Sequence, residues 1–163
     1  MKKRIMVLDD DEQIRQSLQK LLQAEGYEVV AAAEGAEALD ELGRNKIDLL
    51  LLDLNLPNKS GWEIFERVTS NRPLVPVIII TGRAKQSELA VAAGVGALMQ
   101  KPLDVPLLLK TIAELLLEPP EKRLKRLVGV EQSTRCFQPA PAVASVQSSL
   151  RVRRKEPRVR HQL

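Results

Sequence analysis

Five polar residues have side chains whose types and positions could support chemistry. Three are the aspartates Asp9, Asp10 and Asp53, and the others are Thr81 and Lys101. Each of these residues lies at the end of a short apolar run. Two like charges about 4 Å apart repel by roughly 1 kcal/mol in water and by roughly 4 kcal/mol at an effective dielectric near 20. If the three carboxylates converge, a cation is needed to offset their repulsion.

The elements that must position these residues can be read from the apolar pattern. Apolar runs of strand length lie at residues 4–8, 28–32, 47–52, 77–80 and 97–100. Helical spacing appears between and after them, in Ile14, Leu18, Leu21 and Leu22 and again in Leu108, Ile112, Leu115 and Leu116. Strands that alternate with helices predict a parallel sheet, because parallel strands need a long crossover connection. We therefore predict a doubly wound α/β fold of five strand–helix units.

In such a sheet the candidate residues all fall at one edge. Ligands of open parallel sheets bind outside the carboxyl ends of the strands, where the strand order reverses. With a 2-1-3-4-5 order, this point lies between the first and third strands, where Asp9, Asp10 and Asp53 converge. Mg²⁺ is a suitable cation for one or two carboxylates and a phosphate oxygen. Lys101 adds a positive charge and Thr81 a hydroxyl donor, so the set suits a phosphoryl group.

Four segments that carry these residues resemble the receiver domain of response regulators, over roughly residues 3–118. They are VLDDDEQIR for the acid pair, LLLLDLNLPNKSG for the acceptor and its loop, VIIITGR for the hydroxyl and LMQKP for the lysine. The four motifs occur in the family's order and at the ends of the matching strands. The resemblance implies a flavodoxin-like five-stranded sheet of order 2-1-3-4-5.

The resemblance also implies roles for the acidic residues. Asp53 would be the phosphoacceptor, taking a phosphoryl group from a histidine kinase or a histidine phosphotransfer protein. Asp9 and Asp10 would hold Mg²⁺ together with the Asp53 carboxylate and the backbone carbonyl of Asn55. Acids are also favoured near a helix N-terminus by the helix dipole. We assign Asp11 and Glu12 to that structural role, which remains the alternative for Asp9 and Asp10 taken alone.

Around the phosphoryl group, Thr81 would donate a hydrogen bond, Lys101 would pair with the charge, and Pro102 would follow a cis peptide bond. Two features depart from the family pattern. Leu98 stands where receivers usually carry Tyr or Phe, and GVG at 94–96 replaces the usual Gly-Ala-Asp. We expect phosphorylation to survive these changes, whereas the coupling between Thr81 and the surface of the fifth strand is in doubt.

Charge and composition divide the chain into an expected receiver domain at 1–118 and a tail at 119–163. The tail has 11 Lys/Arg and 3 Asp/Glu, whereas the preceding part has 14 and 18. Two prolines should end the last domain helix, a short basic amphipathic segment with Leu124 and Leu127 follows, and 131–163 lacks periodicity. We predict that the tail is largely disordered. A basic segment can also bind acidic partners or nucleic acid.

Bulk composition narrows the class of protein further. The chain has 163 residues, 44% of them hydrophobic, and its single cysteine, Cys136, cannot form an internal disulfide. The apolar run after the basic start is too short for a signal peptide, and no run approaches the ~18 residues of a membrane span. We expect a soluble cytoplasmic protein that makes no membrane contact.

Three functions remain to be compared. The first is a response regulator that signals through contacts with a downstream protein, is not an enzyme, and assists only its own phosphoryl transfer and slow autodephosphorylation. The second is a transcriptional or nucleic-acid-directed regulator acting through the basic tail, although no helix-turn-helix pattern is present. The third is a phosphatase with an aspartyl nucleophile. Families that resemble the haloacid dehalogenases carry Asp-x-Asp at the first strand, which this chain lacks.

Overall fold

A computed structural model of the chain describes residues 1–58, 60–83 and 85–141. The strands are β1 (Arg4–Leu8), β2 (Glu28–Ala32), β3 (Leu49–Asp53), β4 (Val77–Thr81), β5 (Ala97–Gln100) and β6 (Arg135–Phe137). The helices are α1 (Glu12–Ala24), α2 (Gly35–Arg44), α3 (Gly61–Asn71), α4 (Ser87–Ala93), α5 (Val105–Leu116) and α6 (Pro120–Leu127). Within these described ranges, no helix is long and apolar enough to cross a membrane.

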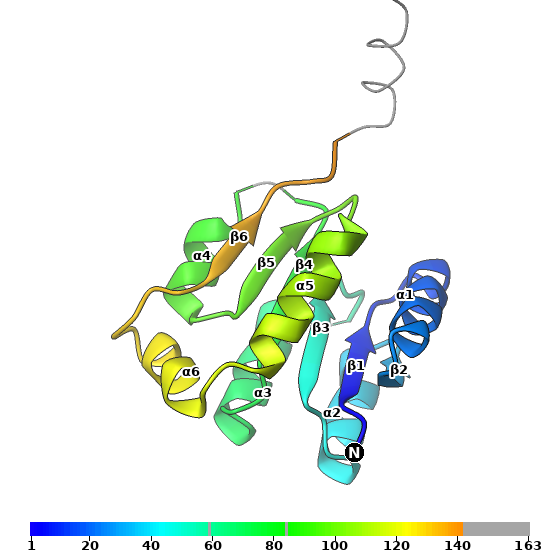
Figure 1. Ribbon diagram of the computed structural model, residues 1–163, viewed down its shortest axis with the longest axis horizontal. Coiled ribbons are helices and arrows are strands. Elements are labelled where there is room, and N and C mark those ends of the chain that lie inside the picture. The colour runs from blue at the N-terminus through cyan, green and yellow to red at the C-terminus, as the bar shows by residue number, and fades with distance from the viewer. Residues whose placement is uncertain (59, 84, 142–163) are drawn as a thin grey trace, which may run out of the picture.

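All neighbouring strands run parallel, in the order β2-β1-β3-β4-β5-β6 (Figure 1). The predicted α/β class and the 2-1-3-4-5 order are confirmed. The sequence predicted five strands, and the structure adds a sixth, β6, at the edge of β5. Strands β3 and β4 each end one residue later than expected, so Asp53 and Thr81 are the last residues of these strands and do not follow them.

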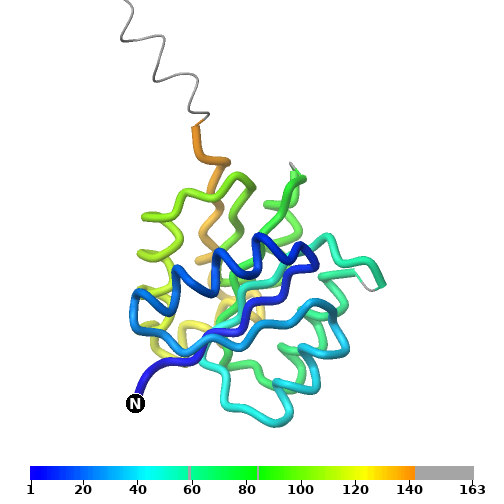
Figure 2. The backbone as a smooth tube through the Cα atoms, turned by 90° about the vertical axis from the view of Figure 1, so that its right-hand side faces the viewer, coloured from blue at the N-terminus to red at the C-terminus, as the bar shows by residue number. Residues whose placement is uncertain are grey.

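Alternate residues of each strand face opposite layers of helices. Met6 and Leu8 of β1 join the core beneath α2, α3 and α4, whereas Ile5 and Val7 join the core beneath α1 and α5. In Figure 2 the two layers of helices lie on opposite sides of the sheet. Because both faces are covered, β3 and β4 are buried along their whole length.

Side-chain caps begin three helices at the positions where the sequence allows them. Asp11 accepts from the backbone N–H groups of Gln13 and Ile14 and is the N-cap of α1. Ser60 caps α3 and Asp104 caps α5 in the same way. The assignment of Asp11 to a helix start is therefore confirmed.

The segment after α5 forms ordered structure on the domain. Pro119 and Pro120 stand at the start of α6, and the chain then returns along β5 as β6. The hydrogen bond from the Ala140 N–H to the Pro102 carbonyl, 2.9 Å, ties the segment to the loop after β5. The prediction of disorder is wrong for β6, because its backbone pairs with a strand edge that the sequence pattern left open. Residues 142–163 lie outside the described residues.

Helix α6 turns its arginines toward the protein. Arg126 is 2% exposed and forms two hydrogen bonds with the Glu118 carboxylate, at 2.7 and 2.8 Å. Arg123 is also buried and donates to the backbone carbonyls of Leu74 and Leu115. Leu124, in contrast, is 41% exposed. Leu127 packs against the apolar core, so the buried face of this basic helix combines one leucine with two arginines that have polar partners.

Gly94, the first residue of GVG, keeps the glycine of the usual Gly-Ala-Asp and contacts this C-terminal segment. Gly94 has φ +73°, and a Cβ there would lie 2.5 Å from the carbonyl oxygen of Arg126. The Arg126 guanidinium donates to the Gly94 carbonyl at 3.2 Å, and Thr134 donates to the Val95 carbonyl at 2.6 Å. Glycine is therefore needed both for the left-handed conformation and for the close approach of α6.

Candidate functional site

The candidate side chains come from adjacent strands at the carboxyl edge of the sheet. Asp9 follows β1, Asp53 ends β3, Thr81 ends β4 and Lys101 follows β5. Parallel pairing aligns these strand ends, because Leu8 lies opposite Leu52 and Thr81 opposite Gln100. The structure therefore brings together residues that are up to 92 positions apart in the sequence.

Lys101 lies between the two buried aspartates. Its Nζ is 3.2 Å from Asp53 Oδ2 and 3.4 Å from Asp9 Oδ2. The other oxygen of each carboxylate accepts a backbone N–H: Asp9 Oδ1 from Asp11 at 2.9 Å and Asp53 Oδ1 from Asn55 at 3.0 Å. Both carboxylates are thus oriented on either side of one ammonium group.

Burial and charge act against each other at this site. Burial raises the pKa of the Asp9 carboxyl above its ordinary value, and the charge of Asp53 raises it further. The hydrogen bond from the Asp11 N–H and the charge of Lys101 lower this pKa and offset part of the rise. Burial alone would lower the pKa of Lys101, but the charges of Asp53 and Asp9 raise it above its ordinary value. Lys101 therefore stays protonated at neutral pH, and the carboxylate pair retains unrelieved repulsion.

A cation could relieve this repulsion. Asp9, Asp10 and Asp53 each offer a carboxylate oxygen, and these oxygens lie within 4.8 Å of one another. Asp10 is exposed, so one side of the cluster is open to solvent. Hard carboxylate oxygens beside water are the donor set that Mg²⁺ favours. The three carboxylates therefore fit a magnesium ion. That the backbone carbonyl of Asn55 also binds this ion stays a prediction.

Thr81 is fully buried, and its hydroxyl oxygen accepts the Arg83 N–H at 3.0 Å. Its backbone carbonyl accepts the Lys101 N–H at 2.8 Å, so the residue is tied directly to the lysine's main chain. Gln100 holds the same loop by donating to the Arg83 carbonyl at 3.1 Å. Lys101 and Pro102 are joined by a cis peptide bond, as expected.

The sequence reasoning missed three residues that shape the site. Gly61 begins α3, and a Cβ there would lie 2.6 Å from the Leu54 Cα, so glycine permits the close approach of α3 to the end of β3. Arg15 bonds the loop after β1, and Gln100 bonds the loop after β4. The glycine of LPNKSG was a visible signal for the first. No local pattern indicates the other two, because their partners depend on the tertiary fold.

Leu98 is 3% exposed and lies opposite Cys136 of β6. The backbone at the position where receivers usually carry an aromatic side chain is therefore paired with the chain's own sixth strand.

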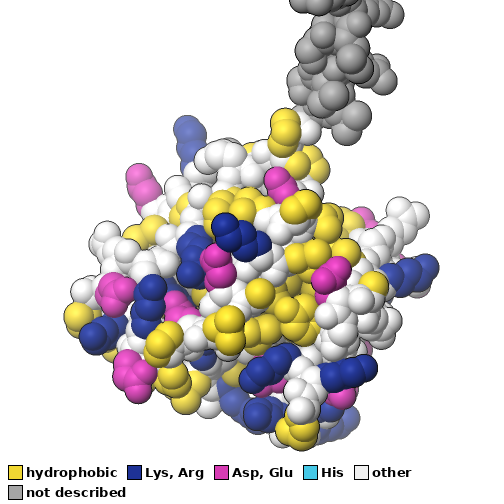
Figure 3. Space-filling model, viewed as in Figure 1, with side chains coloured by type: hydrophobic (Ala, Val, Ile, Leu, Met, Phe, Trp, Pro, Cys, Tyr) yellow, Lys and Arg dark blue, Asp and Glu magenta, His cyan; other side chains and the backbone are white. Residues whose placement is uncertain are grey.

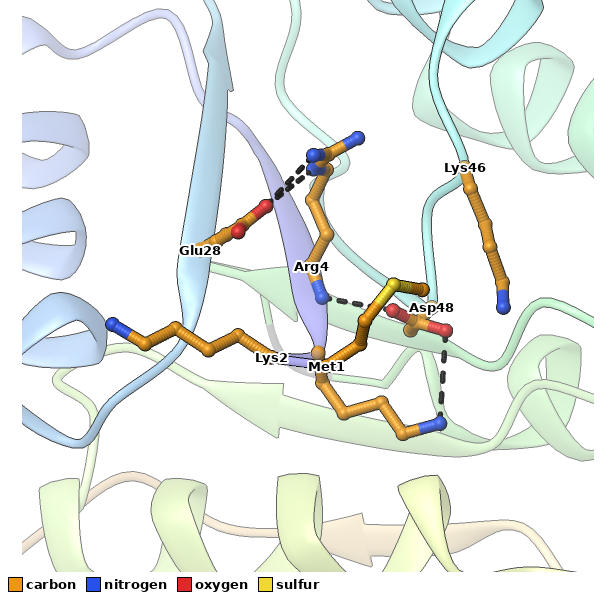
Figure 4. Close-up of a pocket in the computed structure, with 7 residues that line it drawn as sticks. Met1, Lys2, Arg4, Glu28, Lys46 and Asp48 are labelled. Carbon is orange, nitrogen blue, oxygen red and sulfur yellow. Dashed lines mark hydrogen bonds and ion pairs between the residues drawn. The ribbon is translucent and has the colours of Figure 1, made fainter.

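Two hollows in the described surface differ in chemistry. One lies at the opposite, amino edge of the sheet, where Arg4 pairs with Glu28 and Lys3 with Asp48 (Figure 4). Its acidic groups are already paired, and it is remote from the aspartate cluster. The other is an apolar groove beside Lys101, lined by Ile14 and Leu18 of α1 and by Pro102 and Leu103.

Comparisons with known proteins agree with this arrangement. The family model described as the response regulator receiver domain matches residues 5–113. A response regulator MprA from Mycobacterium sp. (strain KMS) is 35% identical over 115 residues, which are 69% of this chain and 50% of that protein. MprA from Mycobacterium bovis (strain BCG / Pasteur 1173P2) is 35% identical over 118 residues, which are 71% of this chain and 51% of that protein. The chain thus spans about half the length of these curated relatives.

Solved structures with the same fold include receiver domains of similar size. A CheY-like receiver domain from Methanospirillum hungatei JF-1 has a TM-score of 0.69 and 35% identity, and covers 77% of this chain and 98% of its own. The response regulator TrrA from Thermotoga maritima, solved in complex with Mg(2+)-BeF, has a TM-score of 0.64 and 32% identity. That match covers 69% of this chain and 98% of TrrA.

Proposed function

Because the chain belongs to the response regulator receiver family, we propose that it is a phosphorylation-dependent response regulator of a two-component phosphorelay, with Asp53 as its phosphoacceptor. The observation that carries the proposal is the position of Lys101, with its Nζ 3.2 Å from Asp53 and 3.4 Å from Asp9. A buried carboxylate held beside a fixed ammonium and an acidic cluster has the parts that phosphoryl transfer needs.

The proposed step is attack by an Asp53 carboxylate oxygen on the phosphorus of a phosphohistidine. The new O–P bond forms as the N–P bond breaks, and the imidazole nitrogen leaves with the electron pair. Lys101 stabilises the charge on the transferred oxygens, and the Thr81 hydroxyl donates a hydrogen bond to one of them. Because both groups are already fixed by the sheet, little reorganisation is needed during transfer.

Mg²⁺, held by Asp9, Asp10, Asp53 and the Asn55 carbonyl, would neutralise charge on the transferred phosphoryl oxygens. The protein contributes the preset carboxylates: backbone N–H groups orient Asp9 and Asp53, while Asp10 faces solvent. The bound phosphoryl group is afterwards lost by slow hydrolysis of the acyl phosphate. The chain is therefore a switch that assists its own chemistry and does not turn over an external substrate.

The groove beside Lys101 supports a protein as phosphodonor. Ile14, Leu18 and Leu103 present an apolar surface next to the proposed acceptor, and Figure 3 shows apolar surface between α5 and α1. A helix of a histidine kinase or phosphotransfer protein could bury this surface and bring its phosphohistidine to Asp53. We place this exchange in the cytoplasm, in keeping with a single cysteine. The signal then passes through contacts with a downstream protein.

The test is Mg²⁺-dependent labelling by acetyl phosphate, followed by intact-protein mass spectrometry. The wild-type chain should gain the mass of one phosphoryl group when Mg²⁺ is present, and Asp53→Asn should gain none. Asp40→Asn, an exposed position on α2, is the matched control and should be labelled like the wild type. Labelling that persists in Asp53→Asn, or its absence from the wild type with Mg²⁺, would overturn the assignment.

A further inference from the structure

Arg15 lies on the first turns of α1 and reaches back to the loop that carries two of the clustered aspartates. Its Nη1 donates to the Asp9 carbonyl at 2.8 Å and is 3.4 Å from the Asp10 carbonyl. The side chain is half-buried, and its contact with the Asp9 carbonyl is partly shielded from solvent. One guanidinium nitrogen thus contacts two successive peptide groups of the loop.

The other contacts of this loop leave its centre dependent on Arg15. At one end, the Asp9 N–H donates to the Ala32 carbonyl at 3.2 Å, which continues the pairing of β1 with β2. At the other end, the Asp11 N–H donates to Asp9 Oδ1 at 2.9 Å. Among the hydrogen bonds of the described residues, Arg15 supplies the side-chain contact to the Asp10 main chain. The main-chain position from which the exposed Asp10 carboxylate extends is therefore held in part by this guanidinium.

The positive charge of Arg15 should weaken Mg²⁺ binding, whereas its contacts with the loop should strengthen that binding. No carboxylate oxygen in the described part of the chain lies within 4.0 Å of the guanidinium. The arginine is thus an unneutralised cation next to a proposed cation site, and its charge alone repels Mg²⁺. Removing Arg15 should therefore tighten Mg²⁺ binding if the charge dominates and weaken it if the contacts dominate, so an experiment can separate the two effects.

We propose that Arg15 is a positioning residue for the metal site, holding the Asp9–Asp10 loop so that both carboxylates face Asp53. The inference rests on the proposed Mg²⁺-dependent function and deepens it. Residues that orient metal ligands typically contribute 10- to 100-fold to metal affinity. That gain outweighs the few-fold loss expected from one nearby positive charge screened by water.

The test is calorimetric titration of the full chain with MgCl₂, using three variants. Arg15→Gln removes both the charge and the two-carbonyl contact, and Mg²⁺ binding should weaken about tenfold or more. Arg15→Lys keeps the charge but offers a smaller ammonium group, and binding should weaken in the same direction by roughly threefold. Lys20→Gln removes one charge from an exposed position of α1 and should leave the affinity within about twofold.

A second measurement keeps the inference testable should Arg15→Gln be less stable. In metal-free protein, NMR amide signals of residues 9–11 should shift in Arg15→Lys while those of β4 and α5 stay in place. Equal or tighter Mg²⁺ binding by Arg15→Gln, with normal binding by the wild type, overturns the role of Arg15 alone. If the wild type takes up no Mg²⁺, the metal part of the proposed function fails and this inference fails with it.

Discussion

Replacing Arg126 with methionine tests whether the segment after α5 is part of the folded domain. The Arg126 and Glu118 side chains are 1% and 3% exposed and are joined by two short hydrogen bonds. Methionine fills much of the same space but leaves the Glu118 carboxylate buried without its main partner. The same substitution removes the hydrogen bonds to the Gly94 carbonyl and to Ser133.

The expected cost is large for a single substitution. Removing one partner of a buried ion pair typically costs about 3–5 kcal/mol, because the remaining charge stays buried and uncompensated. Arg123 remains 3.7 Å from Glu118 and offsets part of this loss. We therefore expect Arg126→Met to lower the free energy of unfolding by about 3 kcal/mol, out of a total of about 5–15 kcal/mol for a domain of ordinary stability.

The loss should depend on pH in a defined direction. Burial by itself raises the pKa of Glu118, but the hydrogen bond and charge of Arg126, with the charges of Arg123 and Arg135, lower it below its ordinary value. A lowered pKa stabilises the fold above the unfolded-state pKa, and this contribution is lost as the pH falls through the folded-state pKa. Without Arg126 the Glu118 pKa should rise. The difference between wild type and variant should thus be largest at neutral pH and narrow on acidification.

The assay is urea unfolding followed by far-UV circular dichroism, at neutral pH and at about pH 4, below the ordinary pKa of a glutamate. Lys125→Met, at an exposed position of the same helix, is the matched control and should change stability by less than about 0.5 kcal/mol. Glu118→Gln combined with Arg126→Met should recover part of the loss, since no buried charge remains. A loss below about 1 kcal/mol for Arg126→Met, or an equal loss at both pH values, would refute this reasoning.

Three further outcomes follow from the same structure. Asp53→Asn removes the charge that raises the pKa of Asp9, so the free energy of unfolding without Mg²⁺ should rise by about 1 kcal/mol at neutral pH. Thermal melting checks this gain, and an unchanged or lower melting temperature would contradict it. Gly94→Ala should lower the free energy of unfolding, measured with urea, by at least about 1–2 kcal/mol, because φ is +73° and the backbone of α6 would contact the added Cβ. Gly43→Ala is the control, at a helical position with open space, and should stabilise the protein by about 0.5–1 kcal/mol. Truncation after residue 118 removes α6 and β6 and should lower the urea midpoint, and an unchanged midpoint would show that they add no stability.

Much of the site could be predicted because its residues follow strands with strong local patterns. Asp9, Asp53, Thr81 and Lys101 each end or follow an apolar run, and parallel pairing brings such ends to one edge whatever the connecting helices contain. Arg15 and Gln100 gave no such signal. Their partners are backbone carbonyls in loops, and any arginine or glutamine on a helix or strand end has the same local pattern.

The C-terminal segment shows the opposite case. The lack of periodicity over 131–163 predicted disorder, yet β6 pairs with β5. The basic amphipathic segment before it was predicted, but its buried side includes Arg126 against Glu118. Hydrophobic patterning detects helices that bury apolar faces. It does not show that the arginines of such a helix are buried, because their ion-pair and carbonyl partners lie outside the segment.

By itself, the sequence determined the α/β class and, through its resemblance to the receiver family, the strand order and the edge at which the aspartates, the threonine and the lysine meet. The α/β class depends on the period of apolar residues, and the shared edge depends on the rule that parallel strands share a direction. The tertiary structure alone decided the sixth strand, the buried arginines of α6, the need for glycine at position 94 and the contact of Arg15 with the Asp9–Asp10 loop. Each of these depends on a polar partner distant in sequence or on backbone packing, and such partners are chosen only once the chain has folded.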